Sequence, residues 1–386
     1  MKRAAIVGVG QTKFVSRHRD LIHPELTFEA SRAALEDAKL SIDNVDALTM
    51  GVMDPFDGVD CCDRWICGAA GGYNKPVIRI NTAGATGMSA AIAAYEQVAS
   101  GMFEIVMAVS EQRVSEPVDA QSLLNTCTCP YHERAMGGSA ISLGAIPATR
   151  HMYKYGSTHE QRALSAVKAH KHGMNNPYAH LRFEVTVQDV LNSMIVEWPL
   201  RLLDCCPRSD GAVAVIFASE DVAKTITDRP AWVNGAVSIA DGPFFGDRPD
   251  VSYRAALAVA ARRLYQKCGI KNPLKDIDVA ELYIPFTSLE LIQTEAYGFC
   301  DEGKGGELLE EGTTWMGGEL PINPSGGVLC TNCIGATAEL RVAEAALQVM
   351  GKGGLRQVPN VETALASGLG GMLQFHTLMM LGSEPR

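Results

Sequence analysis

The stretch Asn323-Pro-Ser-Gly-Gly327, followed closely by Gly335-Ala-Thr337, decides the fold prediction for this chain of 386 residues. Its glycines and proline precede a predicted helix at 337–350 and indicate a tight turn whose backbone amides point into a cleft. Cys333 lies at the start of that helix. Because the positive end of a helix lowers the pKa of a nearby thiol, the pattern predicts that Cys333 is an activated nucleophile. The alternative is a small buried side chain, the commonest fate of a free cysteine.

Two other glycine-rich segments predict turns that line the same cleft. One is Asn81-Thr-Ala-Gly-Ala-Thr-Gly87 at a helix start, and the other is Ser367-Gly-Leu-Gly-Gly371. Small residues admit a ligand close to the backbone, whereas the alternative is that these glycines only allow tight helix packing. The residues that we predict to bind substrate in these turns are Asn81, Gly84, Asn323, Ser325, Gly326 and Gly370.

Strand and helix patterns alternate along most of the chain, which predicts an α/β fold. Residues 112–200 interrupt the alternation and hold most of the histidines, so we expect an inserted region laid over a layered core. We divide the chain into an N-terminal half, 1–225, which includes this region, and a C-terminal half, 226–386. The expected strands are 4–10, 45–52, 78–80, 104–109, 211–218, 231–239, 279–283 and one within 371–381; the expected helices are 27–38, 88–99, 146–155, 158–172, 253–268, 288–297 and 337–350.

Composition excludes several classes of function. The net charge is −10 and no cluster of Lys and Arg occurs, so nucleic acid and anionic membranes are poor partners. No apolar run approaches the roughly 20 residues that a membrane-spanning helix needs. The 11 cysteines lack the spacing of a disulfide scaffold and suit a reducing cytoplasm. No second Cys/His pair lies at zinc-finger spacing from Cys330 and Cys333, so we expect no metal. Lys13 stands where the dinucleotide-binding fingerprint that begins at Gly8 needs its third glycine, so we expect no bound cofactor.

The motif set resembles the thiolase superfamily, in its branch near the sterol-carrier or lipid-transfer thiolases. Besides the turns above, it includes Ser209-Asp-Gly-Ala212, Pro285-Phe-Thr287 and Gly8-Val-Gly-Gln-Thr-Lys-Phe14, and the likeness runs along the whole chain. The resemblance implies a duplicated, five-layered αβαβα fold and tight homodimers. It also implies an acyltransferase whose substrates are acyl-CoA and coenzyme A, acting on the carbon–carbon bond beside the thioester.

The chain departs from this family at its catalytic positions. The family's nucleophilic cysteine falls at Gly84, its Gly-His-Pro histidine falls at Asn332-Cys333-Ile334, and Tyr283-Ile284 stands where relatives have His-Asp or Asn-Glu. These replacements resemble two-component thiolases and retro-aldolases, whose thiolase-like chain pairs with a small zinc-ribbon and OB-fold subunit. (S)-2-benzoylsuccinyl-CoA thiolase is one member of that group. The resemblance therefore implies a heterotetramer with two chains of each kind.

Three functions are compatible with these residues. The principal prediction is a thiolase that cleaves a branched or aromatic 3-oxoacyl-CoA with coenzyme A, using Cys333, or as the less favoured alternative Cys330, as nucleophile and His376 as base. The second is a retro-aldolase acting on a 3-hydroxyacyl-CoA, which needs only an acid/base group such as Tyr283. The third is a non-catalytic acyl-CoA-binding scaffold. For His376 and Tyr283 the alternative is an ordinary core side chain.

Overall fold

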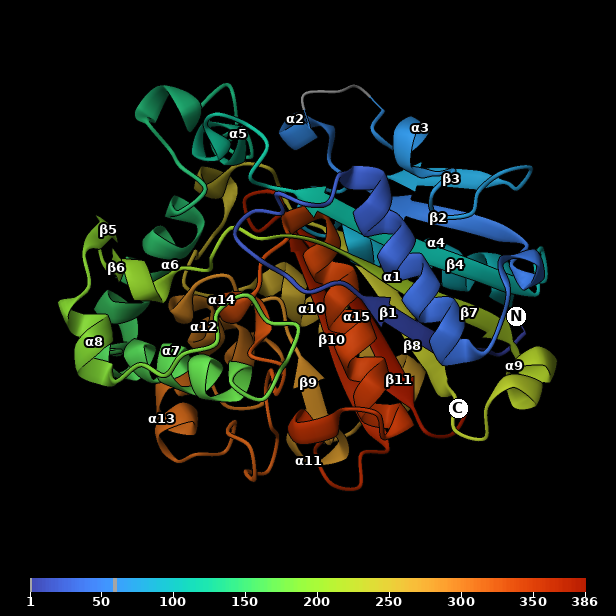
Figure 1. The fold of residues 1–386 in the computed structure, drawn as a ribbon. Helices are drawn as coiled ribbons and strands as arrows, with labels where there is room; N and C mark the ends of the chain where they lie inside the picture. The colour runs from blue at the N-terminus through green and yellow to red at the C-terminus, as the bar shows by residue number, and fades with distance from the viewer. Residues whose placement is uncertain (1, 58–60) are drawn as a thin grey trace.

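The strands form one long mixed sheet through the molecule (Figure 1). The computed structural model describes residues 2–57 and 61–386, and within these residues the sheet has nine strands in the order β3-β2-β4-β7-β1-β8-β11-β10-β9. The strands β1 and β7 are buried along their whole length, as expected for strands that helices cover on each side. The bounds are β1 Ala4–Gln11, β2 Ala47–Gly51, β3 Val77–Ile80, β4 Ile105–Arg113, β7 Asp210–Ser219, β8 Ala231–Ala240, β9 Val279–Glu281, β10 Thr363–Gly370 and β11 Phe375–Gly382, with a separate hairpin of β5 Ile195–Glu197 and β6 Leu200–Arg201.

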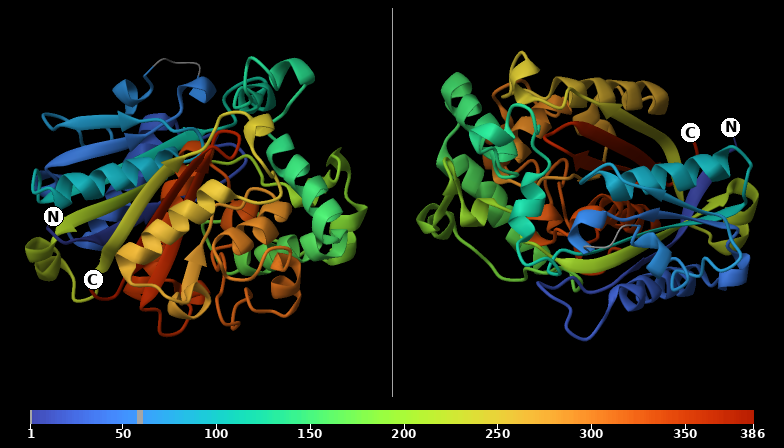
Figure 2. Two further views of the ribbon diagram at one scale, coloured as in Figure 1. Left: turned by 180° about the vertical axis from the view of Figure 1, so that it is seen from behind. Right: turned by 90° about the horizontal axis from the view of Figure 1, so that it is seen from above.

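Four long helices divide this sheet into layers. Helix α1 (His23–Ala38) packs on β1 and β7, and α10 (Ala255–Cys268) packs on β8 and β11. Helices α4 (Thr86–Ala99) and α15 (Ile334–Met350) pack against each other, with α4 on β2 and β4 and α15 on β10. Figure 2 shows α1 and α10 on opposite outer sides of the molecule. The sheet is joined at β1 and β8 through only two residue pairs, so its parts β3-β2-β4-β7-β1 and β8-β11-β10-β9 form two layers, and α15 packs on strands of both. The layers run helix, sheet, helix, sheet, helix, which confirms the predicted five-layered α/β fold.

The remaining helices gather mainly at one side of the layers (Figure 1). The predicted inserted region, residues 112–200, carries α5 to α8, and α7 packs on α12, α13 and α14 of the second half. Their bounds are α2 Asp54–Asp57, α3 Asp63–Ile66, α5 Ala120–Asn125, α6 Ser142–Tyr155, α7 His159–Gly173, α8 Val187–Asn192, α9 Glu220–Ile226, α11 Pro273–Asp276, α12 Thr287–Ala296, α13 Gly305–Glu310 and α14 Gly327–Cys330, together with short 3-10 helices at Ile42–Asn44, Arg134–Met136, Leu202–Asp204, Phe245–Asp247 and Gly354–Arg356.

Small residues bring the two central helices unusually close. A Cβ atom at Gly87 would lie 2.6 Å from the backbone nitrogen of Glu339, so only glycine lets α4 and α15 meet there. A Cβ atom at Gly368 of β10 would lie 3.0 Å from the Cβ atoms of Met88 and Ala338. This close packing brings together the beginnings of α4 and α15 and the end of β10.

The expected elements are found with shifts of a few residues at their ends. Strand β10 is present in the structure but was not predicted. The segment 367–371 is wrong as a predicted turn, because Ser367–Gly370 form the end of β10 and pair with β11. Its small residues fit the narrow space beneath α4 and α15 and therefore lack the bulky pattern that identifies a strand. In the described part of the chain, no helix has the length and apolar character needed to cross a membrane.

Candidate active site

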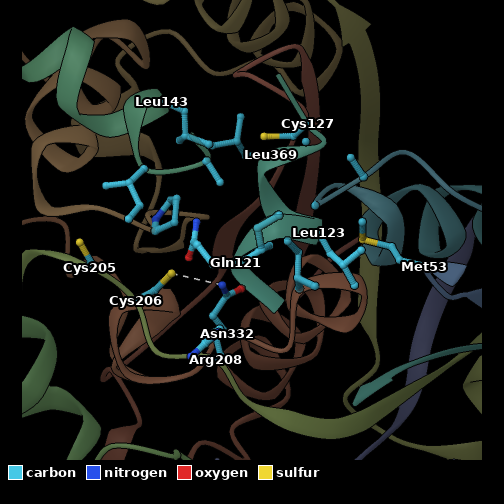
Figure 3. A pocket seen from close by; sticks show the side chains of 18 of the residues that line it. Met53, Gln121, Leu123, Cys127, Leu143, Cys205, Cys206, Arg208, Asn332 and Leu369 are labelled. Carbon is cyan, nitrogen blue, oxygen red and sulfur yellow. Dashed lines mark hydrogen bonds between the residues drawn. The ribbon is translucent and has the colours of Figure 1, made fainter. Parts of the chain in front are cut away.

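A cavity of about 560 Å³ opens where the beginnings of α4 and α15 meet the end of β10. Its wall is largely apolar and comes from both halves of the chain, including the segment after β2, helix α5 and the β5–β6 hairpin (Figure 3). Three of the predicted binding residues line it, namely Asn81, Gly84 and Gly370. The volume lies within the range of small-molecule sites, so this cavity is the candidate active site.

Three polar side chains form a hydrogen-bonded line on the cavity wall. The hydroxyl of Tyr283 donates to Oδ1 of Asn332 over 3.3 Å. Nδ2 of Asn332 donates to Sγ of Cys206 over 3.2 Å (Figure 3). Thr337 also donates to Oδ1 of Asn332, over 3.0 Å. Because two hydroxyl groups hold the carbonyl end of this amide, its N–H groups are directed toward the sulfur of Cys206.

Burial raises the pKa values of the phenol and the thiol in this hydrogen-bonded line. Removal from water raises the pKa of Tyr283 well above its ordinary value. Burial also raises the pKa of Cys206 to about 12, opposed in part by the hydrogen bond from Asn332. Both groups therefore carry their protons at neutral pH, and Tyr283 acts as a hydrogen-bond donor.

Gly84, the position at which the sequence resemblance predicts the family's nucleophile, has no room for a side chain in the structure. A Cβ atom at Gly84 would lie 2.5 Å from the carbonyl oxygen of Leu369 and 3.1 Å from the hydroxyl of Tyr283. The phenol of Tyr283 thus lies beside the position that a side chain at residue 84 would take. Any reaction in this cavity has to use groups other than a side chain at position 84.

Cys333 lies at the predicted helix start but faces away from the cavity. It directly precedes α15, is fully buried, and its Sγ donates to the carbonyl oxygens of Gln112 and Gly211 over 3.0 and 3.1 Å. Burial, with the nearby carboxylates of Glu111 and Asp210, raises its pKa well above the ordinary value. The expected lowering by the helix dipole is wrong here, because desolvation outweighs it, and the structure does not support Cys333 as the nucleophile.

His376 does not line the cavity either. Its ring is buried on β11, and Nη2 of Arg254 lies 3.1 Å from its Nδ1. Burial and the charge of Arg254 hold its pKa well below the ordinary value. A neutral imidazole enclosed in this way has no path to a substrate in the cavity, so the structure does not support His376 as the base.

The Asn323–Gly327 turn supports the core and does not reach the cavity. Oδ1 of Asn323 accepts the backbone N–H of Leu282 over 2.7 Å, and the hydroxyl of Ser325 donates to Glu281 over 2.8 Å. Gly326 has a φ angle of 88°, which glycine adopts without strain. The structure therefore does not support Asn323, Ser325 and Gly326 as substrate-binding residues. Their hydrogen bonds and backbone shape hold the strand end that carries Tyr283.

The sequence interpretation missed the cysteines that do line the cavity. These are Cys127, Cys205 and Cys206. The signal available was the adjacent pair Cys205-Cys206 directly before Pro207 and the Ser209-Asp-Gly motif. Without the fold, nothing indicated that this motif faces the start of α15.

Known proteins of one family match the chain over nearly its full length. A family model described as "Thiolase, N-terminal domain" matches residues 4–221, and one described as "Thiolase C-terminal domain-like" matches residues 239–383. The chain belongs to the thiolase family. An acetyl-CoA acetyltransferase of Methanothermobacter thermautotrophicus is 35% identical over 374 residues, covering 96% of this chain and 97% of the relative. Sterol carrier protein 2 of Homo sapiens is 34% identical, covering 96% of this chain and 70% of the relative.

Solved structures support the same conclusion. The structure described as "Ltp2-ChsH2(DUF35) aldolase" superposes with a TM-score of 0.85 and 28% identity, covering 98% of this thiolase-family chain and 97% of that chain. Human mitochondrial 3-ketoacyl-CoA thiolase superposes with a TM-score of 0.74 and 16% identity, covering 99% and 98%, and shows the shared fold. The protein is a thiolase-type acyltransferase in the lipid-transfer-type branch.

Proposed function

We propose that this thiolase-family enzyme cleaves a 3-oxoacyl-CoA with coenzyme A, and that its acyl group is branched or aromatic. The observation that carries the proposal is the largely apolar cavity beside the line Tyr283, Asn332 and Cys206. Apolar walls favour burial of a bulky hydrocarbon group, while the polar line offers donors at one place on the wall. In this arrangement the ketone carbon of the bound substrate lies next to the sulfur of Cys206.

In this proposal Cys206 supplies the thiol that the predicted Cys333 does not. The sulfur of Cys206 forms a bond to the ketone carbon of the substrate while the bond between C2 and C3 breaks. The electron pair of that bond passes to the thioester enolate, and C2 finally carries the proton that the thiol has lost. Coenzyme A then attacks the acyl group on Cys206, and the proton of its thiol returns to the cysteine sulfur.

The neighbouring groups have separate tasks in this reaction. Tyr283, which keeps its proton, donates a hydrogen bond to the oxygen that gains negative charge. The Asn332 amide donates to the sulfur and favours its thiolate form. The amide itself neither gains nor loses a proton, so the thiol proton leaves Cys206 only as the substrate reacts.

The test is a cleavage assay with 3-oxoacyl-CoA substrates of different acyl groups, each with and without free coenzyme A. We expect coenzyme A-dependent release of two acyl-CoA products, with branched or aromatic substrates preferred over straight chains. Absence of turnover with every substrate, together with measurable binding, would instead support the non-catalytic scaffold.

A retro-aldolase is the second candidate, and the position of the Tyr283 hydroxyl beside Gly84 favours it. Removal of a proton from the 3-hydroxyl group breaks the bond between C2 and C3, gives an aldehyde or ketone, and leaves an enolate that takes up a proton at C2. The oxygen of Tyr283 would take the proton of the 3-hydroxyl group as the phenol gives its own proton to C2, so Tyr283 ends protonated and no thiol is needed. This reaction consumes no coenzyme A, so the same assay with a 3-hydroxyacyl-CoA distinguishes the two candidates.

We also propose a homodimer that binds a small zinc-ribbon and OB-fold subunit. The strand β3 is an edge of the sheet, and the exposed side chain of Ile78 lies on it. Trp65 and Tyr73, shortly before β3 in the chain, are also exposed. An unpaired edge with exposed apolar groups favours association with another chain. The name of the Ltp2-ChsH2(DUF35) aldolase has two components, which supports the proposed small subunit.

A further inference from the structure

Three side chains from separate segments converge outside the cavity. His23 lies at the start of α1, Cys62 directly before α3, and Glu111 on β4. One donor atom from each of the three lies within 4.8 Å of the other two. Nδ1 of His23 lies 2.9 Å from both carboxylate oxygens of Glu111. Glu111 and Cys62 are buried, and His23 is partly exposed.

We propose that His23, Cys62 and Glu111 bind a zinc ion. Imidazole nitrogen, thiolate sulfur and carboxylate oxygen are the donors that zinc takes in proteins, and three protein ligands leave the fourth tetrahedral position for water. When the ion binds, the Cys62 thiol releases its proton to solvent and forms a bond to the metal, with no change in oxidation state. The thiolate and the carboxylate then balance the two positive charges, which makes the buried cluster neutral.

The position of the cluster indicates a structural role. None of the three residues lines the cavity, but Met53, Pro55 and Phe56 do, and they lie shortly before Cys62 in the chain. Asp54 in this segment accepts the backbone N–H of Cys62 over 3.3 Å. A zinc ion would therefore fix one wall of the cavity to α1 and β4. This inference does not depend on which reaction the cavity supports.

The first test is the metal content of the chain, expressed alone so that no zinc-binding partner contributes. After removal of metal with a chelator, the protein is titrated with zinc against a coloured chelator, and bound metal is measured by mass spectrometry. We expect one zinc per chain in the wild type and loss of that zinc in Cys62→Ser and His23→Gln. Cys67→Ser is the matched control, since Cys67 ends the same short helix but lies outside the cluster, and it should retain the metal.

The second test reports on the thiolate directly. Cobalt(II) in place of zinc should give a sulfur-to-metal charge-transfer band that Cys62→Ser lacks and Cys67→Ser keeps. Zinc should also protect Cys62, but not Cys67, from alkylation by iodoacetamide, measured peptide by peptide. A wild-type chain that binds no zinc overturns the proposal even if the variants fail to fold. Equal protection of Cys62 with and without zinc would also overturn it.

Discussion

The side-chain amide of Asn332 donates a hydrogen bond to the sulfur of Cys206 over 3.2 Å. The amide of Asn332 cannot accept a proton, so it orients the sulfur without acting as a base. The same amide is held by Tyr283 and Thr337. The cavity therefore offers oriented hydrogen-bond donors and a protonated thiol, and replacing each of these groups tests its part in the reaction.

Replacing Cys206 should remove thiolytic cleavage. For Cys206→Ser we expect a loss in turnover of about a thousandfold or more, since the covalent route is lost outright. The measurement is coenzyme A-dependent cleavage, with mass spectrometry of the acylated peptide in the wild type. Cys205→Ser is the matched control, because Cys205 also lines the cavity while its sulfur donates to the carbonyl oxygen of Arg201. A Cys206→Ser enzyme of near-normal rate would exclude the cysteine as nucleophile.

Tyr283→Phe separates the two candidate reactions. Loss of one donor to a developing oxyanion should lower the turnover of a thiolase by about a hundredfold to a thousandfold. If Tyr283 is instead the acid/base group of a retro-aldolase, its removal should abolish cleavage of a 3-hydroxyacyl-CoA while Cys206→Ser leaves it intact. The two variants are therefore assayed side by side on both substrate classes.

Asn332→Ala should make Cys206 less reactive at a given pH. The hydrogen bond from Asn332 opposes the burial that raises the pKa of Cys206 to about 12, so its removal raises that pKa further. Below the pKa the thiolate fraction increases with pH, so alkylation should be faster in alkaline than in neutral solution and slower in the variant throughout. Iodoacetamide labelling of the Cys206 peptide measures both effects. Equal labelling rates in variant and wild type would show that the hydrogen bond does not tune the sulfur.

The sequence predicted an α/β fold because buried strands and amphipathic helices have patterns that can be read locally, whereas the five layers were implied by the family resemblance. The same local reading placed Cys333 correctly at a helix start but could not show which way its sulfur points. The sulfur of Cys333 faces backbone carbonyls, and the neighbouring Asn332 faces the cavity instead. Cys206 and the cluster of His23, Cys62 and Glu111 depend on contacts between distant segments, which spacing in the sequence does not reveal.

Disrupting the exposed edge of β3 should prevent the proposed dimer. Ile78→Lys puts a charge on an edge strand, a change that opposes pairing with another chain. We expect a monomer by light scattering where the wild type is a dimer. Val118→Lys changes another exposed apolar side chain, away from this strand, and should leave the dimer intact. A wild type that is already monomeric would contradict the proposal.

A side chain at Gly84 should destabilise the protein and fail to restore the family's nucleophile. Since the Cβ atom would lie 2.5 Å from the carbonyl oxygen of Leu369, Gly84→Ala forces a backbone shift that should lower the free energy of unfolding by about 1–3 kcal/mol. Gly242→Ala is the control, because its Cβ atom would meet no heavy atom within 4 Å and Gly242 has no positive φ angle. Denaturant unfolding of both variants measures the difference. If Gly84→Ala were as stable as Gly242→Ala, the space beside Tyr283 would be larger than the structure shows, and Gly84→Cys would then be a fair test of whether the usual thiolase nucleophile works in this cavity.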